Sequence, residues 1–529
     1  MKSQSFLKGA AILTFSAIVV KIIGFVYTIP LINVLGGEGM GYYYAAYDIY
    51  AFLSIVFTAG VPVAEIKLIS EAYAKGNYRL VDGVFSISRF LFACFGTICA
   101  SAMFFGADFF ADIIKSPNAS PAIRALAPMI LSAAILSAYR GYFQGKSNML
   151  PTAITQILEA VIKMAVGISL VLVLLNHGIG ITYVAAGAIF GVSTGSILAL
   201  ICAIIFKRLE KKQTGMKCAL HINREERKRI ISQILALAIP ITIGTVSFNL
   251  INLIDTGIIL NRLQSALGYS YEEANTLFGI YGNAKKIYNL PVGLIIPLSS
   301  SIIPAITRAK SKNQFQKASN LTFQAIKITA MFSLPCGTGL LIIPYPILKL
   351  IYYSNESEIA LAAPLLALLG IAVVFSSLAL VTSSIIQASE SVRFPAFSMI
   401  IGGIFKILTC WYLVGDERLG IWGAAISTCI CYFVTLILNF GYLLKSHTSE
   451  RRILWVFVKI LIASLIMGGA VYQTFQFLAV ITAERVACII SIGLGIIVYG
   501  IIIIWMRLIT WEDLFQFQIG RKIYSRFGR

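Results

Sequence analysis

About fourteen long apolar stretches follow one another along this chain, and each has the roughly 20 apolar residues that a helix needs to cross a bilayer. The chain is 58% hydrophobic and 12% charged, whereas soluble domains carry about 25% charged residues. We therefore predict an all-α integral membrane protein. The predicted spans are 9–35, 42–66, 84–109, 122–143, 151–176, 181–206, 229–260, 277–306, 321–350, 359–387, 394–414, 419–444, 452–475 and 481–507.

The distribution of positive charge predicts how these spans are oriented. The first apolar run is too long for a signal-peptide core, so we expect it to be retained as a span. An even number of spans puts both termini on one side. Placing that side in the cytoplasm puts most of the 43 Lys and Arg residues into cytoplasmic loops, as the positive-inside rule requires. We expect a multi-pass protein with both termini in the cytoplasm.

Two similar polar passages suggest that the chain is internally repeated. Gln144 precedes Lys163 by the same number of residues as Gln387 precedes Lys406, and in each case the predicted fourth span of a half leads into the fifth. Equivalent spans have the same orientation, which is typical of parallel repeats in transporters. Chance similarity between apolar helices is the alternative. The predicted organisation is an N-lobe at 1–206, a basic cytoplasmic loop at 207–229, a C-lobe at 230–445, and two further helices with a basic tail at 446–529.

Lysines deep within predicted spans are the first candidates for a binding site. A charged side chain at the centre of a bilayer costs about 2.5–3.5 kcal/mol on insertion scales, so most such residues face water or a partner. We expect Lys21, Lys286 and Lys406 to face a ligand. Lys163 follows Glu159 by four residues, so a structural pair on one helix face is its alternative. Three further basic residues lie near span ends, where they can reach the interface: Arg89, Lys327 and Lys459.

Acidic residues within the spans are fewer than basic ones. They are Asp48, Glu65, Glu159 and Asp255. The resulting excess of positive charge suits an anion, especially phosphate, which lysine meets as a point charge. Asp255 follows a polar stripe of Thr245, Asn249 and Asn252, which either lines a cavity or joins helices by hydrogen bonds. Lys286 shares a helix face with Asn289, beside two prolines at 291 and 297 that should break or bend the helix.

The sequence contains no motif for catalysis, a metal or a cofactor. There is no GxxxxGK[ST] loop and no HExxH, and the nine cysteines include no CxxC pair. Buried thiols acting as small apolar groups explain the cysteines. We therefore predict a transporter rather than an enzyme, with no metal, no cofactor and no nucleic-acid partner, driven by gradients or by the membrane potential.

The polar passage from Arg140 to Asn148, RGYFQGKSN, resembles a signature of polysaccharide-type flippases of Gram-positive bacteria, as do Pro151 and the QILE run ending at Glu159. This group contains relatives of stage V sporulation protein B and lipid II flippases of the MurJ type. The resemblance extends over the whole chain. It implies a member of the multidrug/oligosaccharidyl-lipid/polysaccharide (MOP) superfamily, with two pseudo-symmetric six-helix lobes of the MATE and MurJ kind around a central cavity. The two last helices would frame a groove for a polyprenyl tail.

The resemblance also bears on individual residues. Lys21 matches the first basic residue of the family pattern Arg-x-x-Gly-Phe-x-Arg-Asp, and Lys286 matches a basic residue of the eighth span. Tyr27 and Thr28 stand where that pattern has Arg-Asp. Basic cavity residues of the MurJ type meet the diphosphate of lipid II, so the resemblance implies that role for the matching lysines.

These observations together predict a flippase for a polyprenyl-diphosphate-linked oligosaccharide, with the peptidoglycan precursor lipid II as the first candidate. Alternating access would carry an undecaprenyl-diphosphate-linked head group across the bacterial cytoplasmic membrane while its tail stays among membrane lipids. The expected substrate-binding residues are Lys21, Lys286, Lys406, Lys163, Arg140 and Asn289, and the residues expected to couple an ion or gate the path are Asp48, Glu159 and Asp255.

Three other functions compete with this prediction. They are a cation-coupled multidrug exporter of the same superfamily, a glycan-lipid exporter specific to sporulation, and a membrane scaffold or glycan polymerase. A polymerase needs a large outer loop with an acid or base, and the longest predicted outer loop, 261–276, offers only Glu272 and Glu273. A scaffold has little use for interior lysines.

Overall fold

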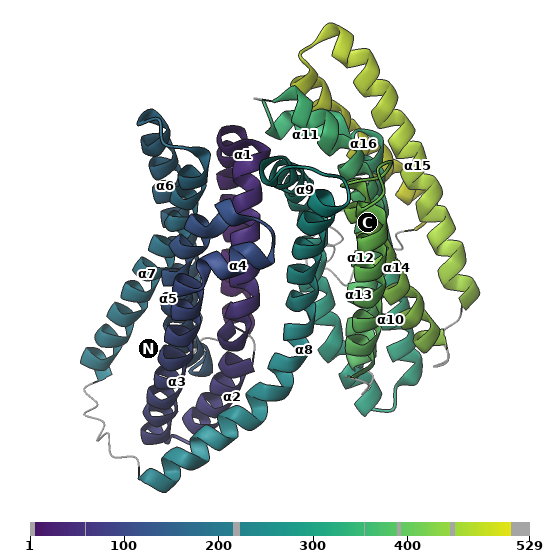
Figure 1. The fold of residues 1–529 in the computed structure, drawn as a ribbon. Helices are drawn as coiled ribbons and strands as arrows, with labels where there is room; N and C mark the ends of the chain where they lie inside the picture. Colours follow the sequence, from purple (N-terminus) through teal and green to yellow (C-terminus); the bar gives the residue numbers. More distant parts are fainter. Residues whose placement is uncertain are drawn as a thin grey trace. The chain divides into compact units, whose positions relative to one another are not determined.

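The computed structural model describes residues 6–58, 60–214, 223–353, 355–388, 393–444 and 450–508. Within these ranges the chain forms helices joined by turns, with no strand (Figure 1). Twelve of the helices are long and apolar enough to cross a membrane. The prediction of an all-α membrane protein is therefore confirmed.

The observed helices follow the order of the predicted spans. α1 (Phe6–Thr58) contains the first predicted span and most of the second, whose last residues belong to α2. The two spans are separated at Gly36, whose φ of 61° lies in the left-handed region that glycine enters at little cost. α8 (Arg224–Ser265) occupies the seventh predicted span and is not one of the twelve candidates. The fourteen predicted spans are thus accommodated by fewer, longer helices.

Two compact units divide the chain. Unit 1 comprises residues 1–283 and 410–423, and unit 2 comprises residues 284–409 and 424–529. The predicted lobe boundaries remain predictions. The middle of the predicted basic loop, 215–222, and most of the predicted basic tail lie outside the described residues. The flanks of that loop are helical rather than extended, since α7 continues to Thr214 and α8 begins at Arg224.

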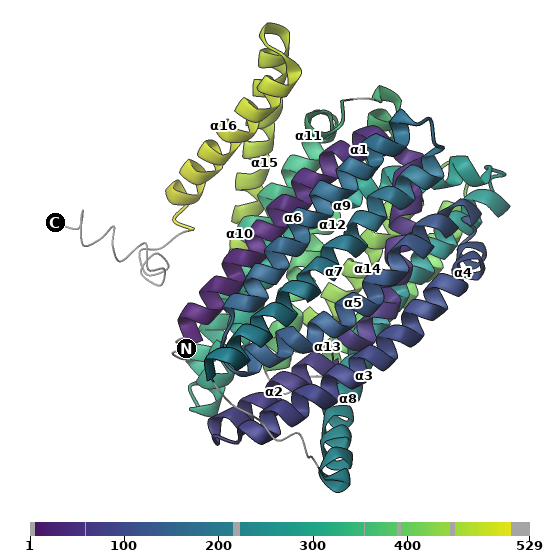
Figure 2. The same ribbon diagram turned by 90° about the vertical axis from the view of Figure 1, so that its left-hand side faces the viewer.

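Unit 1 is a bundle in which α7 packs against α5 and α6, and α5 also packs against α3. α1 lies along α6 (Figure 2), and α2 packs against α3, α5 and α8. Besides α1 and α8, its helices are α2 (Gly60–Ala74), α3 (Tyr78–Phe105), α4 (Ala107–Ile113), η1 (Pro117–Ala119), α5 (Ser120–Gly145), α6 (Leu150–Asn176), α7 (Ile181–Thr214) and the first part of α9 (Tyr271–Ser311).

The backbones of α1 and the first part of α9 approach each other closely in unit 1. A Cβ atom placed on Gly279 would lie 1.8 Å from the carbonyl oxygen of Gly37 and 2.7 Å from the backbone nitrogen of Gly41. The backbones of the two helices therefore meet directly at this point. Small residues allow such close approach between helices in membranes.

Unit 2 is organised around α12, which packs against α10 and α11. Its helices, besides the rest of α9, are α10 (Phe315–Ile342), α11 (Pro344–Ile351), α12 (Glu356–Ala388), α13 (Arg393–Val414), α14 (Trp422–Leu444), α15 (Glu450–Ile481) and α16 (Glu484–Trp505). α15 and α16 lie side by side as a pair (Figures 1 and 2).

A fully buried asparagine joins three helices of unit 2. The Asn439 amide of α14 donates to the Ser383 hydroxyl of α12 over 2.9 Å. Its side-chain oxygen accepts from the Ser398 hydroxyl of α13 over 2.7 Å. Buried polar groups of this kind are stable when their hydrogen bonds are satisfied. The contact holds α12, α13 and α14 in one register.

Two ion pairs fix one end of α16. The Lys349 ammonium of α11 lies 2.8 Å from Glu484, which begins α16, and 3.3 Å from Glu356, which begins α12. The hydrogen bond that Lys349 donates to the Glu484 carboxylate raises the pKa of Lys349 above its ordinary value, because it favours the charged ammonium.

Two features at prolines refine the predicted spans. α9 continues through Pro291 and Pro297, so these prolines do not break the helix, since neighbouring helices and side chains in a membrane protein can satisfy the freed carbonyl groups. The predicted ninth span, 321–350, is two helices, because α10 ends at Ile342 and α11 begins at Pro344. Proline favours the first position of a helix, where its missing N–H is not needed.

Candidate functional site

The predicted site residues are divided between the two units. Unit 1 holds Lys21 and Asp48 on α1, Arg140 on α5, Glu159 and Lys163 on α6, and Asp255 on α8; unit 2 holds Lys286 and Asn289 on α9 and Lys406 on α13.

Arg140 and Glu159 form an ion pair between α5 and α6. α5 ends at Gly145, and Pro151 opens α6 after a short turn, so the two helices are adjacent at this end. Arg140 Nη2 donates to Glu159 Oε2 over 2.7 Å, and its Nε donates to the Thr155 hydroxyl over 3.2 Å. Both side chains are about one-fifth exposed, at 21% and 22%. The charge of Arg140 is therefore offset within the protein.

Replacing Glu159 with glutamine should destabilise unit 1. The change leaves the half-buried guanidinium of Arg140 without its carboxylate, which we expect to cost about 1–3 kcal/mol, between the values for exposed and buried pairs. Thermal unfolding of the purified protein measures the effect. The double replacement Arg140→Met and Glu159→Met removes both charges and should cost less than the single change. Equal losses would contradict this account of the pair.

Lys163 does not form the pair with Glu159 that was the alternative to its predicted binding role. Its ammonium lies over two aromatic rings of α1, 5.2 Å from the centroid of Tyr27 and 5.9 Å from that of Tyr47. Glu159 pairs instead with Arg140. Tyr27 is held in place because its hydroxyl donates to the Ala188 carbonyl of α7 over 2.9 Å. A cation over an aromatic face is attracted by the ring's negative centre.

Three tyrosines of α1 pack against one another next to Lys163. The rings of Tyr43 and Tyr47 stack with centroids 6.2 Å apart, and Tyr50 contacts Tyr47 at 5.5 Å. Tyr47 lies within electrostatic range of Lys163, Glu159 and Asp48. These tyrosines were not among the predicted site residues. Their spacing of three and four residues, which puts them on one helix face, is the signal that would have found them.

A second polar contact of unit 1 joins α1 to α8. The Thr256 hydroxyl of α8 donates to Asp48 Oδ2 of α1 over 2.7 Å. Asp255, beside it on α8, is 2% exposed. The side chains of Thr245 and Asn249, which were predicted to share a face with Asp255, lie outside the described residues. Asp48 and Asp255 are thus on adjoining parts of α1 and α8.

The remaining predicted lysines differ in exposure. Lys21 on α1 and Lys286 on α9 are exposed, as is Asn289. Lys406 is buried in α13, with 4% of its surface exposed. Exposed lysines can meet a ligand directly, whereas Lys406 can reach one only where its surroundings open.

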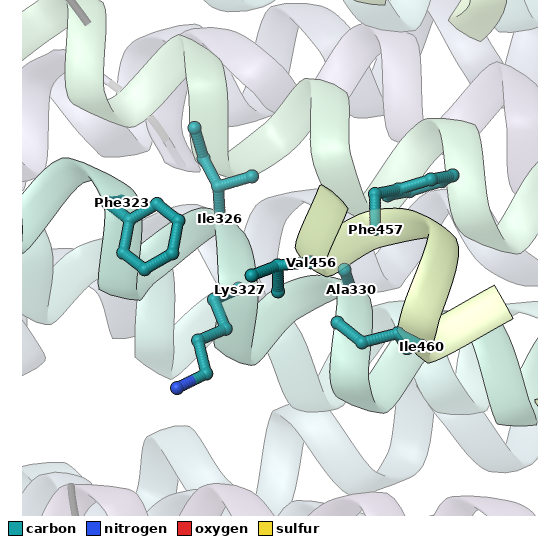
Figure 3. Close-up of a pocket in the computed structure, with 7 residues that line it drawn as sticks. All are labelled: Phe323, Ile326, Lys327, Ala330, Val456, Phe457 and Ile460. Atoms are coloured by element: carbon teal, nitrogen blue, oxygen red, sulfur yellow. The ribbon is translucent and has the colours of Figure 1, made fainter. Parts of the chain in front are cut away.

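A small apolar pocket lies between α10 and α15 (Figure 3). Phe323, Ile326 and Ala330 of α10 line it together with Val456, Phe457 and Ile460 of α15. Lys327 lies at its edge, and its ammonium points away from the apolar side chains. Apart from Lys327, its lining is apolar.

Comparison with known proteins identifies the family. Residues 6–310 match the family described as "Polysaccharide biosynthesis protein", and residues 278–412 match the family named MatE. Stage V sporulation protein B of Bacillus subtilis (strain 168) is 25% identical over 99% of this chain and 100% of its own length. Lipid II flippase MurJ of the same organism is 24% identical over 89% of this chain and 88% of its own.

A solved structure has the same fold. The lipid II flippase MurJ in its inward closed conformation matches with a TM-score of 0.71 and 16% identity, over 93% of this chain and 98% of that one. At this identity the likeness concerns the fold. The family match itself covers more than half of the chain. The chain therefore belongs to the polysaccharide biosynthesis protein family, and its fold is that of the MurJ structure.

Proposed function

We propose that this protein is a flippase of the MurJ type, which moves a polyprenyl-diphosphate-linked oligosaccharide, with lipid II as the first candidate, from the inner to the outer leaflet of the bacterial cytoplasmic membrane. The name of one relative, lipid II flippase MurJ, supports the substrate class. The name of another, stage V sporulation protein B, supports a glycan lipid used in sporulation as the second candidate. In this proposal both termini are cytoplasmic and the chain itself catalyses no reaction.

The observation that carries the proposal is the position of the Lys163 ammonium. Tyr27 stands where the family pattern has an arginine, so α1 lacks that positive charge. The Lys163 ammonium of α6 lies 5.2 Å from the Tyr27 ring centroid. A lysine of α6 thus supplies a positive charge beside the position where the family pattern has its arginine. None of the ion pairs recorded among the described residues includes Lys163. A lysine in this setting can meet a diphosphate oxygen as a point charge.

The other predicted residues have distinct parts in this mechanism. Lys21 and Lys286, both exposed, would contact the diphosphate on entry, and Asn289 would donate to it. Lys406 would join them once its buried surroundings open. The polyprenyl tail would lie along α15, where the apolar pocket against α10 offers a contact of matching chemistry. The head group would cross by alternating access, as expected for transporters with repeated halves.

Arg140 and Glu159 would act as a gate rather than as a simple binding pair. Because the two side chains neutralise each other over 2.7 Å, Arg140 attracts a diphosphate only when Glu159 releases it. Arrival of an anion and loss of the ion pair would therefore be linked. Asp48 and Asp255 would hold a coupling ion where α1 meets α8.

A cation-coupled drug exporter is the second candidate function. It is favoured by Asp255, which is buried on α8 at 2% exposure, and by the MatE match at residues 278–412. Such an exporter needs acidic rather than basic groups at its substrate site. Because Lys163, Lys21 and Lys286 give the opposite balance, we prefer the glycan lipid.

Functional replacement provides the test. We expect this chain to restore growth when the lipid II flippase of a bacterial host is depleted, because it would supply the same transport step. In proteoliposomes, the purified protein should translocate lipid II faster than a polyprenyl monophosphate sugar, since the second phosphate adds a contact for lysine. A headgroup-accessibility assay measures the rates.

Two controls make this test decisive. A version with Lys163 replaced by methionine should insert into the membrane and fail to restore growth, whereas Lys459→Met, on the exposed start of α15, should behave as wild type. Export of a cationic dye with no transport of any polyprenyl-diphosphate glycan would refute the glycan-lipid proposal in favour of the drug exporter.

A further inference from the structure

The Glu65 carboxyl group is an acid that the proposed transport path does not use. It lies on α2 and is fully buried, at 0% exposure. Neither carboxyl oxygen has a hydrogen-bond partner among the described residues. The side chain packs directly on the backbone of α5, since a Cβ atom on Gly141 would lie 2.6 Å from Glu65 Oε2. Glycine at 141 therefore leaves the space that Glu65 occupies.

Burial without hydrogen bonds makes the charged form of this group costly. An ionised carboxylate that loses its water and gains no partner is destabilised by several kcal/mol, and the usual response is to bind a proton. A purely structural role is a poor explanation, because an apolar side chain of similar size would fill the space at no such cost. The neutral, protonated acid is the form that suits this site.

One positive group acts on Glu65 from a neighbouring helix. It is Lys207 of α7, whose ammonium lies 3.6 Å from Asp82 of α3. The ammonium also lies 3.2 Å from the ring centroid of Phe85 and 3.9 Å from that of Tyr142. Asp82 is one-third exposed, at 34%. Lys207 therefore pairs with a carboxylate that solvent reaches, and its charge also acts on the buried acid.

The other charged groups of the helices around α2 lie near Lys207 and not near Glu65. Within the described residues, neither α1 nor α8 has a titratable group whose charge acts on Glu65. The charged groups near Lys207 from α3, α5 and α7 are Arg89, Lys146 and Glu210, of which the last two pair with each other.

A cavity of about 390 Å³ opens beside the same helix, between α2, α3 and the start of α8. Leu68, one helical turn from Glu65, lines it, and so do the charged Arg79 and Glu226. Along α2 the cavity thus comes within one helical turn of the buried carboxyl group.

We propose that Glu65 is a proton-binding site inside unit 1, which exchanges protons with solvent through Lys207 and Asp82. Uptake adds one proton to the carboxylate and leaves the neutral acid. Release returns that proton to solvent through Asp82 and leaves a negative charge that Lys207 balances. The further step, that this proton drives the transport cycle, rests on the proposed function.

Infrared spectroscopy of the purified full-length protein tests the site directly. We expect a carbonyl band of a protonated carboxyl group in an apolar setting, and its loss when Glu65 is replaced by glutamine. Lys207→Met should move the titration midpoint of this band to higher pH by about one unit or more, because it removes the cation that favours the ionised form. Glu71→Gln, on the exposed side of the same helix, is the matched control and should leave the band unchanged.

The outcomes separate this inference from the proposed function. A band that persists in Glu65→Gln, or a wild-type protein with no such band, would overturn the proton site. Should Glu65→Gln fail to fold, the midpoint shift in Lys207→Met decides alone, and an unmoved midpoint counts against the site. A band that behaves as expected in a protein that moves no glycan lipid would leave the proton site standing and refute the transport proposal. Glycan-lipid transport that ignores an imposed pH gradient would refute only the coupling.

Discussion

Replacing Lys21 or Lys286 with methionine is expected to lower transport of a polyprenyl-diphosphate glycan by about tenfold to a hundredfold. Methionine keeps an unbranched side chain and removes the charge. The loss corresponds to one charge-assisted contact with a phosphate oxygen, which is worth about 1.5–3 kcal/mol. Initial rates in proteoliposomes made with equal amounts of inserted protein measure the effect.

The control for these variants separates charge at the site from charge in general. Lys21→Arg and Lys286→Arg keep the charge and should retain most of the transport, although the fork of arginine meets phosphate with a different geometry. Lys459→Met removes a positive charge from α15 and should change little. Wild-type transport rates in both methionine variants would show that neither lysine contacts the diphosphate.

Replacing Gly279 with valine is expected to prevent unit 1 from folding. Already the Cβ atom would lie 1.8 Å from the Gly37 carbonyl oxygen, and the obstacle is backbone, which cannot rotate away as a side chain can. Overpacked cores that can adjust lose about 1–3 kcal/mol, so we expect a larger loss here. The yield of monodisperse protein after extraction from the membrane and its unfolding temperature are the measurements.

A second glycine provides the matched control for this variant. Gly257 on α8 would place its Cβ atom in open space, with no atom within 4 Å. Gly257→Val should therefore give nearly wild-type yield, since both changes add the same side chain to a helix. If Gly279→Val gave as much folded protein as Gly257→Val, the close contact between α1 and α9 would be wrong.

The fold could be predicted well from sequence because it depends on a strong and local signal. Each apolar stretch long enough to cross a bilayer must become a helix, since no other open structure satisfies its backbone there. Helix ends were harder. The division of 321–350 at Pro344 and the continuity of α9 through Pro291 depend on what neighbouring helices offer to the backbone, which a single sequence does not specify.

The candidate site was harder to predict, because partners are chosen between helices. Glu159 and Lys163 are four residues apart, which favours a pair on one helix, yet Arg140 of α5 approaches Glu159 more closely. Lys207 was assigned to a loop from its charged neighbours, although it lies within α7 beside Phe85 and Tyr142. The functional assignment of Lys21, Lys286 and Lys406 remains a prediction.

The ion pairs of Lys349 have a mechanical consequence for the last two helices. They pin the beginning of α16 to α11 and α12, next to the turn where α15 ends. The apolar pocket against α10 lies near the opposite end of α15, at Val456 and Ile460. The far part of the pair packs on α10, where the Tyr499 hydroxyl of α16 also donates to the Met331 carbonyl over 2.7 Å. The two ends are thus held by different forces, and added salt should weaken the ion pairs at the turn while leaving the apolar packing against α10 in place.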